Sequence, residues 1–250
     1  MILQQPFLII LGLIFGSFVS ALTWRYPKNI SIKKGRSVCP NCRKQIAWFD
    51  NIPLFSYIFL GGKCRNCKKR ISFRYPLIEA TSGACFLVIG VFFPTDYFKL
   101  IYALFIYLIL ICIFVIDLEN QFIPDSFVFT GIAATVIYSL LSGDSTIFSR
   151  LLVGFAAASL LLLVHLLTKG RGMGLGDVKF AVLGGFIVGS RFFLIWLLLA
   201  FLTGAIVGTI LIMLKKAHLK SQIAFGPFLV FAISLVLLYG EKILFWLNIG

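Results

Sequence analysis

The sequence predicts an all-α integral membrane protein of about eight transmembrane helices, with a zinc-binding cytoplasmic insertion between the first two. Three observations lead to this prediction. Of the 250 residues, 60% are hydrophobic, and the mean hydropathy is +1.01, whereas soluble domains are roughly half apolar. The apolar residues gather in long runs. Four cysteines stand in two close pairs within the most basic part of the chain.

The apolar runs set the order of the predicted helices, because about 17 to 25 apolar residues are needed to cross a bilayer. We expect spans over residues 2–23, 76–95, 97–116, 126–142, 147–167, 178–190, 192–214 and 226–247. The sixth is short and rich in glycine. The first lacks the basic start of a signal peptide, so we expect it to be retained. The chain is thus predicted to divide into residues 1–23, 24–75 and 76–250.

The distribution of basic residues predicts the orientation. Of the 23 Lys and Arg, 13 lie from Arg25 to Arg74, together with a single acid, Asp50. The positive-inside rule then places this segment in the cytoplasm and the N-terminus outside. Arg191, on a predicted outer turn, is a mild exception. The bases on the other predicted inner connections agree with this orientation: Lys169, Arg171, Lys215, Lys216 and Lys220.

The cysteine pairs predict a structural zinc site. Cys39 and Cys42 form one CxxC pair, Cys64 and Cys67 form the second, and 21 residues separate the pairs. Four thiolates at this spacing are typical of tetrahedral zinc and leave no open position for catalysis. Two disulfides or a redox pair are the alternatives, but a cytoplasmic location disfavours disulfides. Cys85 and Cys112 lie in predicted spans and are interpreted as packed thiols.

The basic residues around these cysteines have two interpretations. Soluble zinc ribbons bind nucleic acid through such residues, whereas a segment tethered beside a membrane attracts anionic lipid headgroups. We favour lipids and expect no nucleic-acid partner. The residues concerned are Lys63, Arg65, Lys68, Lys69 and Arg70.

Acidic residues near a membrane are rare and usually functional. Five of the nine acids gather near the predicted inner face: Glu79, Asp117, Glu119, Asp125 and Asp177. Asp117 follows the third span and Asp177 opens the sixth, so carboxylates from two helices are expected to meet. Such a pair can share a proton and activate water, one carboxylate as base and the other as acid. This chemistry is that of an aspartyl peptidase.

The stretch GMGLGDVKF surrounds Asp177 with glycines, including Gly174 and Gly176. Glycine lets a backbone turn at a helix start and lets a substrate approach closely. The alternative is that Asp177 only caps its helix. A zinc metalloprotease is disfavoured, since the chain has two histidines and no HExxH motif.

Taken together, the motifs resemble those of the prepilin peptidases, also called type IV prepilin leader peptidases. The resemblance rests on GSF at 16–18, CPNC and CRNC with WFDNIPLFS between them, ISFRYPLIE at 71–79, IDLENQFIPD at 116–125, GMGLGDVKF, and FGPFL at 225–229. It extends over nearly the whole chain. One departure is that GSF is followed by Val-Ser-Ala, where the family usually has Asn-Val.

The resemblance implies a bifunctional enzyme of the bacterial inner membrane. It implies removal of the basic leader of type IV prepilins or pseudopilins at the cytoplasmic face, then N-methylation of the new N-terminus with S-adenosylmethionine. Residues 76–250 would be the peptidase core. Asp117 and Asp177 match the family's catalytic aspartates, Asp125 is the second choice for the first position, and Lys179 is expected to orient the pair. Glu79 and the zinc segment are candidates for the methyl-donor site.

Two other functions use part of the sequence. A proton-coupled transporter would use Asp117 and Asp177 as a relay, but it predicts acids at several depths. A zinc-ribbon scaffold would explain the cysteines and leave the carboxylates without a role. The peptidase interpretation accounts for both features.

Overall fold

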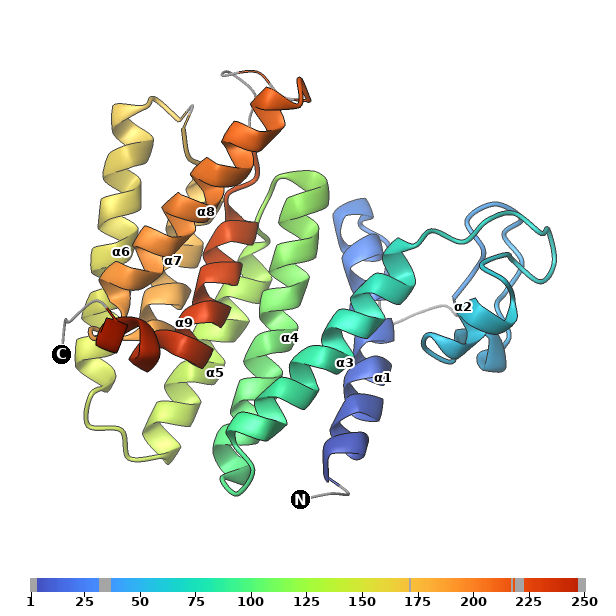
Figure 1. Ribbon diagram of the computed structural model, residues 1–250, viewed down its shortest axis with the longest axis horizontal. Helices are drawn as coiled ribbons and strands as arrows, with labels where there is room; N and C mark the ends of the chain where they lie inside the picture. Colours follow the sequence, from blue (N-terminus) through green and yellow to red (C-terminus); the bar gives the residue numbers. More distant parts are fainter. Residues whose placement is uncertain (1–3, 32–36, 171, 217, 219–222, 247–250) are drawn as a thin grey trace. The chain divides into compact units, whose positions relative to one another are not determined.

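The computed structural model describes residues 4–31, 37–170, 172–216, 218 and 223–246 (Figure 1). Arg171 and Lys220, used for the predicted orientation, lie outside these ranges. The described residues form helices and no strand, which confirms the all-helical prediction. The helices are α1 (Gln4–Arg25), η1 (Tyr26–Lys28), η2 (Trp48–Asn51), α2 (Phe55–Phe59), α3 (Arg74–Phe92), α4 (Tyr97–Asn120), α5 (Asp125–Leu141), α6 (Ile147–Leu167), α7 (Leu175–Val188), α8 (Phe193–Met213) and α9 (Gly226–Trp246).

Each predicted span corresponds to one helix. Among the described residues, α1, α3, α4, α6, α8 and α9 are long and apolar enough to cross a membrane, as expected for a multi-pass membrane protein. Helix α5 has 17 residues and α7 has 14. At 1.5 Å per residue, α7 is only about 21 Å long, which is less than the roughly 30 Å of a hydrocarbon core. Helix α4 continues to Asn120, so Asp117 lies inside the helix rather than after it.

The chain folds as two compact units, Met1–Cys112 and Ile113–Gly250, and α4 belongs to both. The division predicted from the sequence, into residues 1–23, 24–75 and 76–250, follows the expected ends of the membrane spans instead. It stays a prediction. The packing of the first unit positions the cysteine segment, and the packing of the second positions Asp117 and Asp177.

In the first unit, α1 packs along α3 through small residues. The stretch GLIFG places Gly12 and Gly16 four residues apart on α1. A Cβ atom at Gly12 would lie 2.7 Å from the Ser82 carbonyl, and one at Gly16 would lie 2.8 Å from Cα of Glu79. Two helices can approach this closely only where side chains are missing, which is the small-residue packing common in membranes.

Arg74 ties the start of α3 to the end of α1. Its Nη1 donates to the Ser20 carbonyl at 2.9 Å, and its Nη2 donates to the Thr23 hydroxyl at 2.7 Å. Because these residues lie at the two ends of the 26–73 connection, that connection leaves and rejoins the helix pair at one place. The cysteine segment is therefore anchored to α1 and α3 at both ends.

In the second unit, α7 is the central helix. It packs against α5, α6, α8 and α9, and except for Leu175 in its first turn its apolar side chains are buried or half-buried, Phe180 and Leu183 completely. A helix that is apolar all round belongs in the interior. Trp196 of α8 adds a buried bond, since its indole N–H donates to the Leu229 carbonyl of α9 at 3.0 Å. The acid of GMGLGDVKF thus stands at the start of the most enclosed helix of the unit.

Candidate active site and metal centre

Asp117 is buried near the end of α4, with 4% of its surface exposed. Its Oδ2 accepts the backbone N–H of Gly226, the first residue of α9, at 2.9 Å. A Cβ atom at position 226 would lie 2.6 Å from that oxygen, so only glycine permits the contact. The positive end of the α9 dipole also favours a carboxylate there. Asp117 therefore has a fixed place that depends on a residue from another helix.

Asp177 is buried in the first turn of α7, with 7% of its surface exposed. Its Oδ2 accepts the backbone N–H of Gly174, the residue that precedes the helix, at 3.0 Å. The capping contact considered from the sequence is therefore present. A carboxylate can accept about four hydrogen bonds, so one backbone donor leaves capacity for water or substrate.

The two carboxylates belong to one site. The two side chains lie near enough for an electrostatic interaction, and Ile123 contacts the backbone beside both. A Cβ atom at Gly176 would lie 3.2 Å from Cβ of Ile123, and one at Gly226 would lie 3.0 Å from its Cδ1. The structure thus brings together the two aspartates that the sequence singled out, and the residue that approaches Gly176 closely is Ile123. The close approach of a substrate stays a prediction.

Asp125 and Lys179 form a separate pair at the surface. The Lys179 ammonium lies 2.8 Å from both carboxylate oxygens of Asp125, and both side chains are about half exposed. Lys179 follows Asp177 by two residues, and positions i and i+2 of a helix do not face each other. The structure therefore joins Lys179 to Asp125 and directs it away from the buried aspartate of its own helix.

Glu79 is also buried, with 8% of its surface exposed. Its Oε2 accepts the backbone N–H of Leu54 at 2.9 Å, and the Ser17 side chain hydrogen-bonds to it as well. Leu54 has φ 59° and ψ −49°, and the N–H of Phe55 donates to the Pro53 carbonyl at 2.6 Å. This is a γ-turn of the rare, positive-φ form, which costs about 1–3 kcal/mol of backbone strain. Glu79 holds this strained turn.

The two cysteine pairs fold into the same local structure. The N–H of Cys39 donates to the Lys44 carbonyl at 3.0 Å, and the N–H of Arg43 donates to the Cys39 carbonyl at 2.9 Å. The second pair repeats both bonds 25 positions later, each at 2.9 Å. Arg43 and Lys68, one after each pair, share a positive φ, 56° and 57°. Each pair is therefore a tight loop that directs two thiols to one side.

The four sulfurs lie at distances that fit zinc. All four Sγ atoms are within 4.8 Å of one another, and Cys39 Sγ lies 3.9 Å from Cys67 Sγ. Tetrahedral zinc with bonds of about 2.3 Å requires sulfurs about 3.8 Å apart. The residues present fit the metal, and the predicted four-cysteine cluster is confirmed as a site that can hold it.

The segment between the pairs is tied to the second pair by Arg65. The guanidinium donates from Nε and Nη2 to both oxygens of Asp50, at 2.7–3.1 Å. These hydrogen bonds and the nearby positive charge hold the pKa of Asp50 below its ordinary value.

Gly226 is a residue of the candidate active site that sequence reasoning missed. The motif FGPFL was noted only for the resemblance, although Gly-Pro at a helix start is a signal of its own, because proline is favoured in a first turn. Nothing in the sequence joins residues 117 and 226. The carboxylate that caps α9 could be found only from the fold.

Two family models cover most of the chain. Residues 10–93 match the bacterial peptidase A24 N-terminal domain, and residues 104–209 match the type IV leader peptidase family. No solved structure matches the chain.

Several curated relatives carry the name prepilin leader peptidase/N-methyltransferase. The one from Aeromonas salmonicida is 34% identical over 84% of this chain and 74% of its own length. The one from Pseudomonas aeruginosa is 31% identical over 94% and 90%, and the one from Bacillus subtilis is 30% identical over 95% of both. The resemblance drawn from the motifs and the prediction of an enzyme are confirmed. The chain therefore belongs to the type IV leader peptidase family of membrane enzymes and carries the N-terminal domain of its bacterial members.

Proposed function

We propose that the chain is an aspartyl peptidase that removes the basic leader of prepilins or pseudopilins, with Asp117 and Asp177 as the catalytic residues. The observation that carries the proposal is the pair of buried carboxylates, each held by a backbone N–H at the start of a helix. The names of the relatives support the substrate class.

The reaction uses one ionised and one protonated carboxyl group. The ionised group takes a proton from a bound water, and the water oxygen adds to the scissile carbonyl carbon. The protonated group gives its proton to the carbonyl oxygen. When the tetrahedral intermediate collapses, the C–N bond breaks and the leaving amine takes up a proton. Backbone donors at Gly226 and Gly174 fix the carboxylates in place, and such preorganisation lowers the barrier.

The proposed orientation places the cysteine segment and the active site at the cytoplasmic face of the inner membrane, with the N-terminus outside. The clustering of acids near one face supports this, because acids attract the Lys and Arg of a leader. The basic residues around the cysteines would bind anionic headgroups.

The second part of the proposal is N-methylation of the new N-terminus, which the relatives' names support. S-adenosylmethionine would supply the activated methyl group. Zinc on the four cysteines would hold the intervening segment in shape, since structural zinc contributes folding free energy.

The test is cleavage of a model prepilin in membranes by Asp117→Asn, Asp177→Asn and Asp125→Asn variants. Each of the first two should lower the rate roughly 10³-fold or more, the scale of general acid–base catalysis. Asp125→Asn should remain active, because its partner is the exposed Lys179.

Zinc content and detergent-extracted yield serve as folding controls for all three variants. Full cleavage by Asp177→Asn would reduce that residue to a helix cap. Proton flux that depends on Asp117 without any cleavage would instead favour the proton-coupled transporter.

A further inference from the structure

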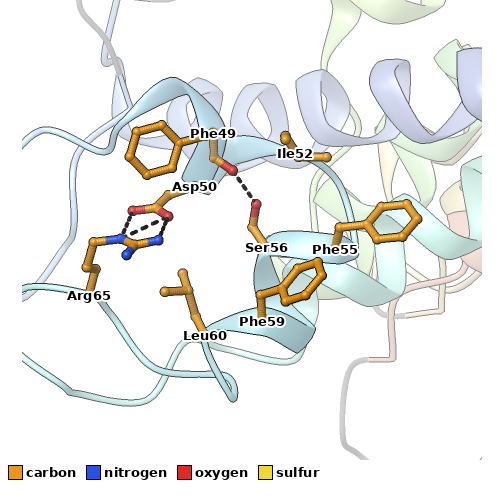
Figure 2. Close-up of a pocket in the computed structure, with 8 residues that line it drawn as sticks. All are labelled: Phe49, Asp50, Ile52, Phe55, Ser56, Phe59, Leu60 and Arg65. Carbon is orange, nitrogen blue, oxygen red and sulfur yellow. Dashed lines mark hydrogen bonds and ion pairs between the residues drawn. The ribbon is translucent and has the colours of Figure 1, made fainter.

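A cleft of about 330 Å³ lies in the segment between the two cysteine pairs (Figure 2). Phe49, Phe55 and Phe59 are among the residues that line it, and the Asp50–Arg65 ion pair forms part of its wall. Its volume is near the lower end of the roughly 300–1,000 Å³ found for small-molecule sites. The cleft is lined by residues of the first unit, whereas the proposed catalytic aspartates belong to the second.

The wall presents both signs of charge side by side. Figure 2 shows the Asp50 carboxylate facing the Arg65 guanidinium, and the Arg65 side chain remains 56% exposed. An α-amino acid group has the complementary pair, an ammonium for the carboxylate and a carboxylate for the guanidinium. Aromatic rings beside such a pair suit a cation or a flat heterocycle.

The shape of the cleft depends on the strained turn at Leu54. Phe55 and Ser56, which line the cleft, directly follow this residue. The Ser56 hydroxyl donates to the Phe49 carbonyl at 2.8 Å across the cleft (Figure 2). The N–H of Leu54 is held by the buried carboxylate of Glu79. Glu79 hydrogen-bonds to the Leu54 N–H and to the Ser17 side chain, and none of these three residues lines the cleft. Glu79 therefore acts on the cleft through the backbone at Leu54.

We propose that this cleft binds S-adenosylmethionine, with its amino acid end on Asp50 and Arg65 and its adenine against the phenylalanine rings, and that Glu79 is a positioning residue. This rests on the methyl-transfer part of the proposed function. The donor carries an α-amino acid, a sulfonium cation and an adenine, and the cleft offers a group for each.

The first test measures donor binding to the purified full chain, by equilibrium dialysis with labelled S-adenosylmethionine and without any pilin. Asp50→Asn should weaken binding at least about tenfold, the value of one charged hydrogen bond. Asp144→Asn is the matched control, because it breaks an Asp–Arg pair of the other unit and should leave binding unchanged. Zinc is measured in each variant, since Arg65 adjoins Cys64.

The second test separates positioning from direct contact at Glu79. Glu79→Ala should weaken donor binding about tenfold, because the turn at Leu54 relaxes. Glu79→Gln keeps an oxygen for the Leu54 N–H and should bind nearly as wild type. Glu79→Ala with Leu54→Gly should recover binding, because glycine adopts positive φ without strain. A donor that touched Glu79 directly would not be restored by a glycine at position 54.

Leader cleavage and methylation by the same variants distinguish failure of the cleft proposal from failure of the proposed function. Cleavage should persist in all of them. If the wild type methylates but Asp50→Asn binds the donor normally, the cleft proposal is overturned and the proposed function stands. If the wild type neither methylates nor binds the donor, methyl transfer itself fails. Loss of binding to anionic vesicles with normal donor binding would assign the exposed rings to lipid and also overturn the proposal.

Discussion

The carboxylate site and the cysteine segment fix their geometry in opposite ways. Asp117 and Asp177 are almost completely buried, and backbone donors at helix starts hold them. The cysteine segment has only short helices, and its apolar side chains are largely exposed, Trp48 at 73% and Phe59 at 85%. Little apolar surface is buried there, and we propose that a metal on the four thiols orders this segment.

This difference predicts which changes each region tolerates. The geometry of the carboxylate site depends on helix packing, so cleavage should be sensitive to one added methyl group at a contact and insensitive to chelators. The cysteine segment, if ordered by a metal, should tolerate substitutions on its surface and should unfold when the metal is removed.

Loss of the zinc ligands should give the largest structural effect. Cys39→Ser with Cys64→Ser should reduce bound zinc from about one per chain to almost none and unfold the segment between the pairs. Donor binding and methyl transfer should be lost, while cleavage largely remains, because Asp117 and Asp177 belong to the other unit. Zinc is measured by atomic absorption, and folding by limited proteolysis.

Cys85→Ser with Cys112→Ser is the matched control for two lost thiols and should retain zinc. A fully folded segment without metal would contradict the structural role, and a need for added metal in cleavage would contradict the aspartyl mechanism.

Gly226→Ala should give the next largest effect, confined to cleavage. The new methyl group would lie 2.6 Å from Asp117 Oδ2, so the carboxylate must move and lose its N–H donor. A displacement near 1 Å in an active site costs about 100-fold in rate. Zinc and donor binding should not change. Gly208→Ala is the control, since the nearest atom to a Cβ there is 3.7 Å away. Normal cleavage by Gly226→Ala would show that the contact is not needed.

The sequence allowed prediction of what depends on local pattern. Apolar runs predicted the helices because hydropathy decides which segments leave water. The spacing of the four cysteines predicted the metal cluster, because each cysteine pair lies in a loop of a few residues whose hydrogen bonds are local.

The contacts that could not be predicted join distant positions. The Asp117–Gly226 bond spans 109 residues, and the Glu79–Leu54 bond spans 25. Leucine carries no sign of a positive φ, so the strained turn has no sequence signature. The end of α4 was placed too early because its last turn is polar, although the helix continues to Asn120.

The smallest expected effect concerns the exposed pair of Asp125 and Lys179. Because both side chains are about half exposed, the pair should contribute about 0.2–1 kcal/mol to stability. Lys179→Met and Asp125→Asn should therefore have similar, small effects on cleavage and thermal stability, and the double variant should add little. The sequence resemblance gave Lys179 a different part, orienting the aspartates. In that case Lys179→Met would lower cleavage far more than Asp125→Asn, and the pH profile of cleavage would shift only in the lysine variant. Equal effects would show that the pair is an ordinary surface ion pair. The buried carboxylates would then be held by the backbone N–H groups at the starts of α7 and α9 and not by Lys179.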